Sequence, residues 1–286
     1  LAISHSCNSY FVNLYRMAVD AKKWGGVEKG HQKWYEYMTS FGLGHRLGID
    51  IPGEYAGYAI DTVGMNKRYR GLWNSCSELY LGMGQGAVSV TPMQMANAMC
   101  IIANKGYYYL PHFVNSIDND DMDVLKKFKE RHTVAHVKDT AYSSVILGMA
   151  DVVESGTGKN ARIDGVVVCG KTGTAENNAF VNGQLKKMKS HAFFVAFAPK
   201  DNPKIAVAVV VENSGYGGTF AAPIAGLIME KYLNDTISVK KKPVVQKMLE
   251  TVTMDPVVIA KSKLDSLNGA TARLSIEQML REYFRY

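Results

Sequence analysis

The order of apolar and polar positions along the chain predicts a series of helices, then three strands, then a further helix. The segments with apolar residues at helical spacing are 9–21, 34–41, 95–103, 137–153 and 224–233. The runs rich in β-branched and aromatic residues are 166–175, 191–198 and 205–212. Polar loops separate these runs, which is typical of an antiparallel meander. We therefore expect an α+β fold, an antiparallel sheet flanked by helices with a helical subdomain.

Local signals sharpen two parts of this pattern. Thr91 can cap a helix, Pro92 suits its first position, and Gln94 completes a capping box. The stretch 44–77 contains several glycines and polar–aromatic alternation, so we predict a long loop-rich region there. Beyond Thr236 we expect only short elements: a strand at 257–259 and a helix at 275–283.

Composition and charge exclude several classes of protein. Hydrophobic residues make up 47% of the chain and charged residues 21%, so a sizeable core can form. No apolar run approaches the roughly 18 residues of a membrane span. The net charge is +7, and the segment after Thr236 holds nine Lys or Arg against five Asp or Glu. Lys240–Lys242 precedes Pro243, which favours an exposed linker, and we predict no nucleic-acid partner.

The four cysteines, Cys7, Cys76, Cys100 and Cys169, show no C-x-x-C spacing. His132 and His136 share helical spacing, but no third ligand lies nearby in sequence. We therefore expect neither a metal site nor a cofactor.

Residues 165–172 match the phosphate-loop pattern G-x-x-x-x-G-K-[ST] letter for letter. A phosphate loop follows a strand, wraps backbone N–H groups around an anion and opens a helix. Here the variable positions are three valines and a cysteine, which are strand residues, and the residues after Thr172 lack helical periodicity. We predict that this segment is a strand and that the chain is no nucleotide hydrolase.

As the end of a strand, Lys171-Thr172-Gly173-Thr174 has another use. Strand alternation places Lys171 and Gly173 on one face. A cation, a hydroxyl and an open backbone edge then lie together, and Gly173 leaves room for a substrate backbone alongside. Such an edge suits acyl transfer on a peptide-like substrate that ends in a carboxylate. An ordinary edge strand remains the alternative for this motif alone.

A second motif favours the functional reading. Ser6-Cys7-Asn8 fits S-x-N, and S-x-N followed by K-T-G is similar to the catalytic set of penicillin-binding proteins and β-lactamases. The segments that extend the resemblance are 2–12, 41–44, 48–53, 82–86, 91–96, 171–175, 191–199 and 205–213. Over about residues 1–235 the chain resembles a class B penicillin-binding protein of the penicillin-binding protein 2 group. We therefore divide it into a partial transpeptidase domain, 1–235, and a basic C-terminal tail, 236–286.

The resemblance implies a D,D-transpeptidase that cross-links peptidoglycan stem peptides through an acyl-serine intermediate and binds β-lactams covalently. Ser6 would belong to the proton relay, and Asn8 would hold the side-chain amide of the substrate. Lys171 would raise the local positive potential and assist Ser6. Thr172 would bind the terminal carboxylate, and the N–H of Thr174 would form half of the oxyanion hole.

The chain also departs from the family pattern. Family order puts the nucleophilic serine of S-x-x-K several dozen residues before S-x-N, hence before Leu1. We therefore expect the fold to lack its N-terminal part, with the nucleophile and the first two of five sheet strands, and the chain to be inactive alone. The strand edge at 205–211 would then need cover, from the tail strand near Val257 or from a second copy.

Two rival functions use the same motifs. A serine β-lactamase needs a base to activate water, and Glu54, Glu78 and Glu154 are candidates by residue type only. A non-catalytic β-lactam sensor domain is the other alternative. If the transpeptidase resemblance holds, the parent protein would be anchored in the bacterial cytoplasmic membrane with this domain in the periplasm. A SEDS-type membrane glycosyltransferase is the partner that the family implies.

Overall fold

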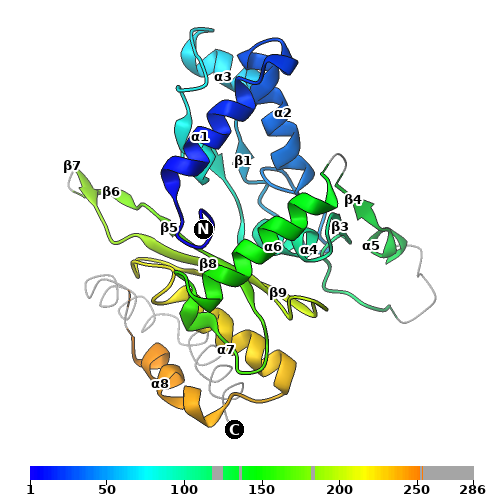
Figure 1. The fold of residues 1–286 in the computed structure, drawn as a ribbon, viewed down its shortest axis with the longest axis vertical. Helices are drawn as coiled ribbons and strands as arrows, with labels where there is room; N and C mark the ends of the chain where they lie inside the picture. Colours follow the sequence, from blue (N-terminus) through cyan, green and yellow to red (C-terminus); the bar gives the residue numbers. More distant parts are fainter. Residues whose placement is uncertain (118–124, 135–136, 182–183, 252, 254–286) are drawn as a thin grey trace.

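The centre of the fold is a three-stranded antiparallel sheet with strand order β5-β8-β9 (Figure 1). It is described from a computed structural model, which describes residues 1–117, 125–134, 137–181, 184–251 and 253. The strands of this sheet are β5 (Cys169–Ala175), β8 (His191–Ala198) and β9 (Ile205–Val211). The remaining strands are β1 (Tyr58–Ala59), β2 (Val88–Ser89), β3 (Tyr107–Tyr108), β4 (His132–Thr133), β6 (Asn178–Val181) and β7 (Gln184–Lys187).

Helices surround the sheet and build a second, mainly helical part beside it. The α-helices are α1 (Asn8–Val19), α2 (Val27–Ser40), α3 (Thr62–Tyr69), α4 (Pro92–Ala103), α5 (Lys126–Lys129), α6 (Asp139–Glu154), α7 (Ala221–Asn234) and α8 (Lys242–Glu250). The short 3-10 helices are η1 (Lys22–Trp24), η2 (Leu79–Met83), η4 (Lys159–Ala161) and η5 (Val239–Lys241).

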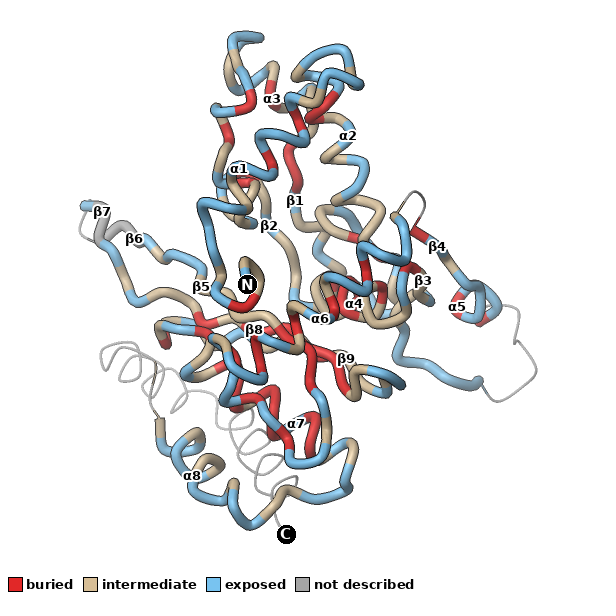
Figure 2. Tube along the Cα trace, viewed as in Figure 1, coloured by how far each residue is buried: buried red, intermediate tan, exposed pale blue. Residues whose placement is uncertain are grey.

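The two faces of the sheet bury different clusters of apolar side chains. On one face, Phe194 and its same-face neighbours pack against α7. On the other face, Val195 and Phe197 pack against α4 and α6. Figure 2 shows the buried residues concentrated in β8 and α7. Lys171 pairs with Val195 in the β5–β8 register, so its side chain emerges on the face of α4 and α6.

The helical part is held together by a third apolar cluster. Tyr15 and Val19 of α1, Met65 of α3 and Leu81 of η2 meet there. His31 of α2 is fully buried among them: its Nδ1 accepts from the hydroxyl of Tyr15 at 3.1 Å. Its Nε2 donates to the carbonyl of Ile60 at 3.0 Å, so both ring nitrogens have partners.

The predicted order of helices, three strands and a helix is confirmed. The capping box of α4 is present as predicted, with Thr91, Pro92 and Gln94 in their expected places. The second half of the phosphate-loop pattern, residues 169–172, lies in β5, which leads into the β6–β7 hairpin and not into a helix. The prediction of a strand is confirmed for these residues.

The loop-rich region predicted at 44–77 also contains a helix that was not predicted, α3. Asp61 caps this helix by accepting a hydrogen bond from the N–H of Gly64 at 2.7 Å. Only Met65 of the helix is buried, so its sequence carries little apolar periodicity. The β6–β7 hairpin was also not predicted, because each of its strands has only four residues and half of the eight are polar.

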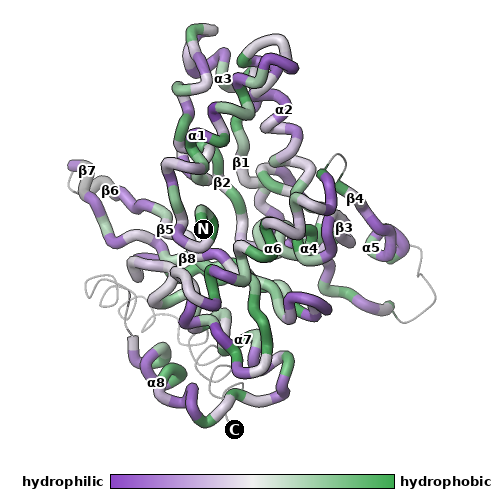
Figure 3. The backbone as a smooth tube through the Cα atoms, viewed as in Figure 1, coloured by the Kyte–Doolittle hydropathy of each residue, from purple (hydrophilic) through white to green (hydrophobic). Residues whose placement is uncertain are grey.

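The expectation of an exposed linker at Lys240–Lys242 is wrong, because η5 and α8 form there, with Pro243 in the first turn of α8. The predicted elements at 257–259 and 275–283 lie outside the described residues. Within the described part of the chain β9 pairs only with β8, so cover for its other edge stays a prediction. Figure 3 shows the hydrophobic sequence of β8 at the centre and the hydrophilic α5 at the periphery.

Candidate active site

The two sequence motifs meet through Ser6 and Lys171. Ser6 lies in a tight turn before α1, with its N–H donating to the carbonyl of Ile3 at 3.2 Å and a left-handed φ of 51°. The ammonium of Lys171 donates one hydrogen bond to the hydroxyl oxygen of Ser6 and another to the carbonyl of Thr172 at 2.8 Å. S-x-N and K-T-G therefore form one site.

The environment of Lys171 changes its acidity. Burial lowers the pKa of its ammonium from the usual 10.5 to about 8, because an apolar surrounding disfavours the charged form. An amine with this pKa exchanges protons readily near neutral pH. Its hydrogen bond with the Ser6 hydroxyl gives that proton a path.

The free edge of β5 faces this site. Two of its backbone carbonyls accept hydrogen bonds from side chains. The carbonyl of Thr172 accepts from the Lys171 ammonium. The carbonyl of Thr174 accepts from Nε2 of Gln85 at 3.3 Å. The N–H and C=O of one strand residue point to the same side of the strand. The N–H of Thr174 therefore faces the free edge as well.

A cavity of about 550 Å³ adjoins the strand edge, and Lys171, Thr172, Gly173 and Thr174 line one side of it. Most of its other wall is apolar, and includes Met38, Leu43, Val90, Met95, Phe193 and Val195. The structure thus brings the K-T-G residues to one cavity with Ser6 at Lys171. Asn8, the exposed first residue of α1, does not line this cavity.

Gln85 is a site residue that the sequence analysis missed. It follows η2 in the turn Gly82-Met-Gly-Gln-Gly86 and lines the cavity. Under this turn lies Glu78, which is 5% exposed, accepts from the Tyr69 hydroxyl at 2.9 Å and pairs with Arg68 at 3.2 Å. The signal in the sequence that could have identified it is a long polar side chain between two glycines, Gly84 and Gly86.

The three glutamates considered as a hydrolytic base do not line the cavity beside Lys171. Glu54 accepts from the backbone N–H groups of Leu47, Gly48 and Ile49, which closes its own loop. Glu78 supports the Gln85 turn, and Glu154 pairs with Arg162 at 3.5 Å.

One S-x-x-K tetrad does occur in this chain, Ser238-Val-Lys-Lys241, which the sequence analysis overlooked. The backbone N–H of Ser238 donates to Glu230 of α7 at 3.3 Å, and the Lys241 ammonium lies 3.1 Å from the same carboxylate. The tetrad is therefore tied to α7, on the opposite face of the sheet from Lys171. It follows K-T-G in the chain, against the family order.

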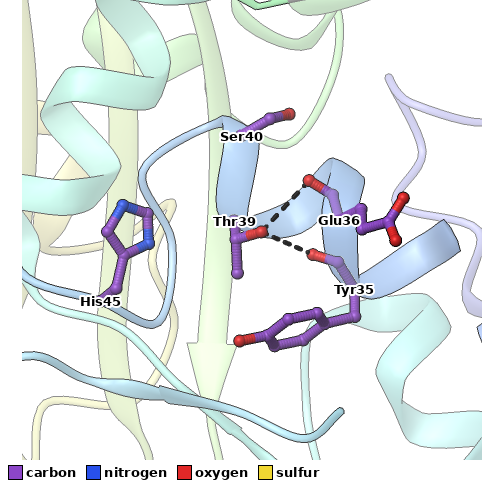
Figure 4. A pocket seen from close by; sticks show the side chains of 5 residues that line it. All are labelled: Tyr35, Glu36, Thr39, Ser40 and His45. Atoms are coloured by element: carbon purple, nitrogen blue, oxygen red, sulfur yellow. Dashed lines mark hydrogen bonds between the residues drawn. The ribbon is translucent and has the colours of Figure 1, made fainter. Parts of the chain in front are cut away.

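A second hollow lies on the surface between α2 and the following loop (Figure 4). Tyr35, Glu36, Thr39, Ser40 and His45 line it. Its Thr39 hydroxyl donates to the carbonyls of Tyr35 at 3.0 Å and Glu36 at 3.2 Å, within its own helix. These bonds stabilise the end of α2, and they use the hydrogen of the Thr39 hydroxyl, which is then not available to a ligand in this hollow.

Among the described residues, no three His, Cys, Asp or Glu side chains gather where they could hold a metal ion. No helix in the described ranges is long and apolar enough to span a bilayer.

Residues 1–230 match the family described as penicillin binding protein transpeptidase domain. The chain therefore belongs to this family, and the predicted fold class is confirmed by solved structures. The crystal structure of Pseudomonas aeruginosa PBP2 in complex with WCK 5153 matches with a TM-score of 0.62 and 28% identity, over 84% of this chain and 49% of that one. The complex of PBP2 and MreC from Helicobacter pylori matches with a TM-score of 0.62 and 25% identity, over 82% and 39%.

Curated relatives include a protein named as a peptidoglycan D,D-transpeptidase. Peptidoglycan D,D-transpeptidase MrdA of Haemophilus influenzae is 33% identical over 260 residues, which cover 86% of this chain and 38% of the relative. Stage V sporulation protein D of Bacillus subtilis is 29% identical over 285 residues, 96% of this chain and 40% of the relative. The chain thus spans about two fifths of the length of these relatives. The predicted resemblance to a penicillin-binding protein 2-like transpeptidase is confirmed.

Proposed function

We propose that the chain supplies part of the active site of a peptidoglycan D,D-transpeptidase, which cross-links stem peptides through an acyl-serine intermediate and binds β-lactams covalently. The observation that carries this proposal is the hydrogen bond from Lys171 to Ser6. It joins K-T-G to S-x-N beside a cavity with an open strand edge. The relatives named as transpeptidases support the same reaction class.

Each motif residue has a role in this proposal. Ser6 and Lys171 pass a proton between the nucleophile and the leaving amine, which the lowered pKa of Lys171 favours. Thr172 binds the terminal carboxylate, and Gly173 leaves room for the substrate backbone. The N–H of Thr174 donates to the developing oxyanion, a contribution of about 3 kcal/mol in other acyl transferases. Asn8 holds the side-chain amide of the substrate once substrate is bound.

The nucleophile in this proposal comes from an S-x-x-K segment outside this chain. The apolar wall of the cavity suits such a segment, since a helix with one apolar face could cover it and bring a serine to Lys171. We further propose that residues 1–235 form the transpeptidase region and that 236–286 are a separate tail. The parent would be anchored in the bacterial cytoplasmic membrane and face the periplasm. Its partners would be a SEDS-type glycosyltransferase and, as for PBP2 of Helicobacter pylori, MreC.

Labelling with a fluorescent penicillin tests the proposal. The 286-residue chain should show no label that survives denaturation, whereas a parent protein with S-x-x-K before Leu1 should be labelled. Lys171→Met in the parent should slow labelling about a hundredfold or more. Stable label on the chain itself would contradict the external nucleophile, and Ser238→Ala and Ser6→Ala variants would then locate the acylated serine.

The rival functions give different outcomes with the same parent protein. Rapid turnover of a chromogenic cephalosporin would favour a β-lactamase over the transpeptidase. Stable acylation without cross-linking of stem peptides would favour a sensor domain. Stable acylation together with cross-linked product is the result that we expect.

A further inference from the structure

The loop between α6 and η4 brings Thr157 against Thr172. The two hydroxyl oxygens lie 2.7 Å apart, although 15 residues separate them in sequence. Thr157 belongs to Ser155-Gly-Thr-Gly158, a segment to which the proposed function assigns no role.

Close backbone contacts hold Thr157 in place. A Cβ atom at Gly156 would lie 2.6 Å from the carbonyl oxygen of Ser4, in the turn that carries Ser6. A Cβ atom at Gly218 would lie 2.4 Å from the carbonyl oxygen of Thr157 itself. Asn160 fixes the second contact by donating from Nδ2 to the Gly218 carbonyl at 2.7 Å. The Thr157 loop is therefore packed against both the Ser6 turn and the segment before α7, with no room for larger side chains.

At this distance one of the two hydroxyls donates a hydrogen bond to the other. Each hydroxyl has one hydrogen to donate and lone pairs to accept. When Thr157 donates to Thr172, the hydrogen of Thr172 is free for a third group. Thr172 pairs with Phe194, so its side chain leaves β5 on the opposite face from Lys171, but the residue also lines the cavity at the free edge of the strand. The third group that we assign to this hydrogen is a ligand held along that edge. An ionised carboxylate gains most from such a donor, because charge-assisted hydrogen bonds are the stronger ones.

We propose that Thr157 is a positioning residue that acts through Thr172. Its hydroxyl donates to the oxygen of Thr172 and directs the Thr172 hydrogen toward the free carboxylate of the substrate. This inference rests on the proposed function and deepens it, because it names a residue that makes the site prefer a carboxylate to a neutral end group.

The test compares a charged and a neutral ligand in the parent protein that carries S-x-x-K before Leu1. The measured quantity is the second-order rate constant of acylation by benzylpenicillin and by its methyl ester. Thr157→Val removes the hydroxyl at nearly constant volume and should slow acylation by benzylpenicillin roughly tenfold, about 1.4 kcal/mol. Acylation by the ester should change less than about twofold, since it lacks the charged acceptor.

Matched variants separate positioning from structural damage. Thr157→Ser keeps the hydroxyl and should restore the preference for the carboxylate. Ser155→Ala removes a neighbouring hydroxyl that donates only to the Asp151 carbonyl, at 3.4 Å, and should leave both rates unchanged. In a Thr172→Val background, Thr157→Val should not lower the acylation rate further, because Thr157 acts only through the Thr172 hydroxyl. If Thr157→Val does not fold, Thr157→Ala gives the same comparison.

The possible failures are distinguishable. If the unsubstituted parent is acylated by neither ligand, the proposed function is wrong and this inference falls with it. If the parent is acylated but Thr157→Val slows both ligands equally, or adds its full loss to that of Thr172→Val, the inference alone is overturned.

Discussion

Lys171 of β5 donates a hydrogen bond to the hydroxyl of Ser6, a residue 165 positions earlier in the chain. This contact joins the strand that ends in K-T-G to the turn before α1. It also keeps a partly buried ammonium beside a proton donor, where the pKa of the ammonium falls to about 8.

The buried Lys171 should make folding stability depend on pH. Between its folded pKa of about 8 and its unfolded value near 10.5, the unfolded chain binds more protons. The free energy of unfolding contributed by Lys171 should therefore rise as pH increases through this window. Urea titrations of the wild type and Lys171→Met at pH 7 and pH 10 measure it. The free energy of unfolding of the wild type, relative to that of Lys171→Met, should be larger at pH 10 than at pH 7. An equal difference at both pH values would contradict the burial of Lys171.

His31 should make the helical part sensitive to acid. Burial lowers the pKa of its imidazole below 6.5, so below that pH the unfolded chain takes up a proton that the folded chain does not. Stability should fall as pH drops from 6.5 to 5. The fluorescence of Trp34 and Trp73, whose rings lie 5.4 and 5.5 Å from the imidazole, reports the change. His31→Gln can keep both hydrogen bonds without titrating, and an equally acid-sensitive His31→Gln variant would rule out His31 as the cause.

Gln94 should contribute strongly to stability although it is polar. It is 1% exposed, completes the capping box with Thr91, and donates from Nε2 to the carbonyls of His45 at 2.6 Å and Ala56 at 2.8 Å. Gln94→Ala should lower the free energy of unfolding by about 2–4 kcal/mol, because the helix loses half of its capping box and the carbonyls of His45 and Ala56 lose their donor. The control is Gln246→Ala on the exposed side of α8. This variant should change the free energy of unfolding by less than about 0.5 kcal/mol. Similar losses for both variants in urea denaturation would contradict this role.

Lys241 should attach α8 to the rest of the chain. It pairs with Glu230 of α7, whose side chain is 4% exposed. Lys241→Met leaves that carboxylate buried without its cation, and we expect a loss of about 3 kcal/mol. Lys240→Met breaks an exposed pair with Asp164 and should change stability little. Proteolysis near α8 should accelerate only in Lys241→Met; equal rates in the two variants would show that this pair does not hold α8.

Much of the fold follows from local sequence signals. The alternation of Ala, Phe and Val in β8 and the Thr91-Pro-Met-Gln94 cap of α4 depend on interactions within a few residues, so they can be read along the chain. Helix α3 and the β6–β7 hairpin could not, because both elements are short and neither carries a periodic apolar signal. The helix at Lys240–Lys242 was missed for a different reason: its charge is compensated by Glu230 and Asp164, which are distant in sequence.

In the candidate active site, too, some features follow from the sequence and others only from the tertiary structure. The sequence by itself determined the motifs S-x-N and K-T-G, the strand that carries Lys171, and the family to which they belong. Only the tertiary structure decided that Lys171 reaches Ser6, that Gln85 binds the Thr174 carbonyl, and that Thr157 meets Thr172. The physical reason is the range of the interactions. Strand periodicity and helix caps arise between neighbours in the chain, whereas these contacts and the lowered pKa of Lys171 arise from packing between distant segments.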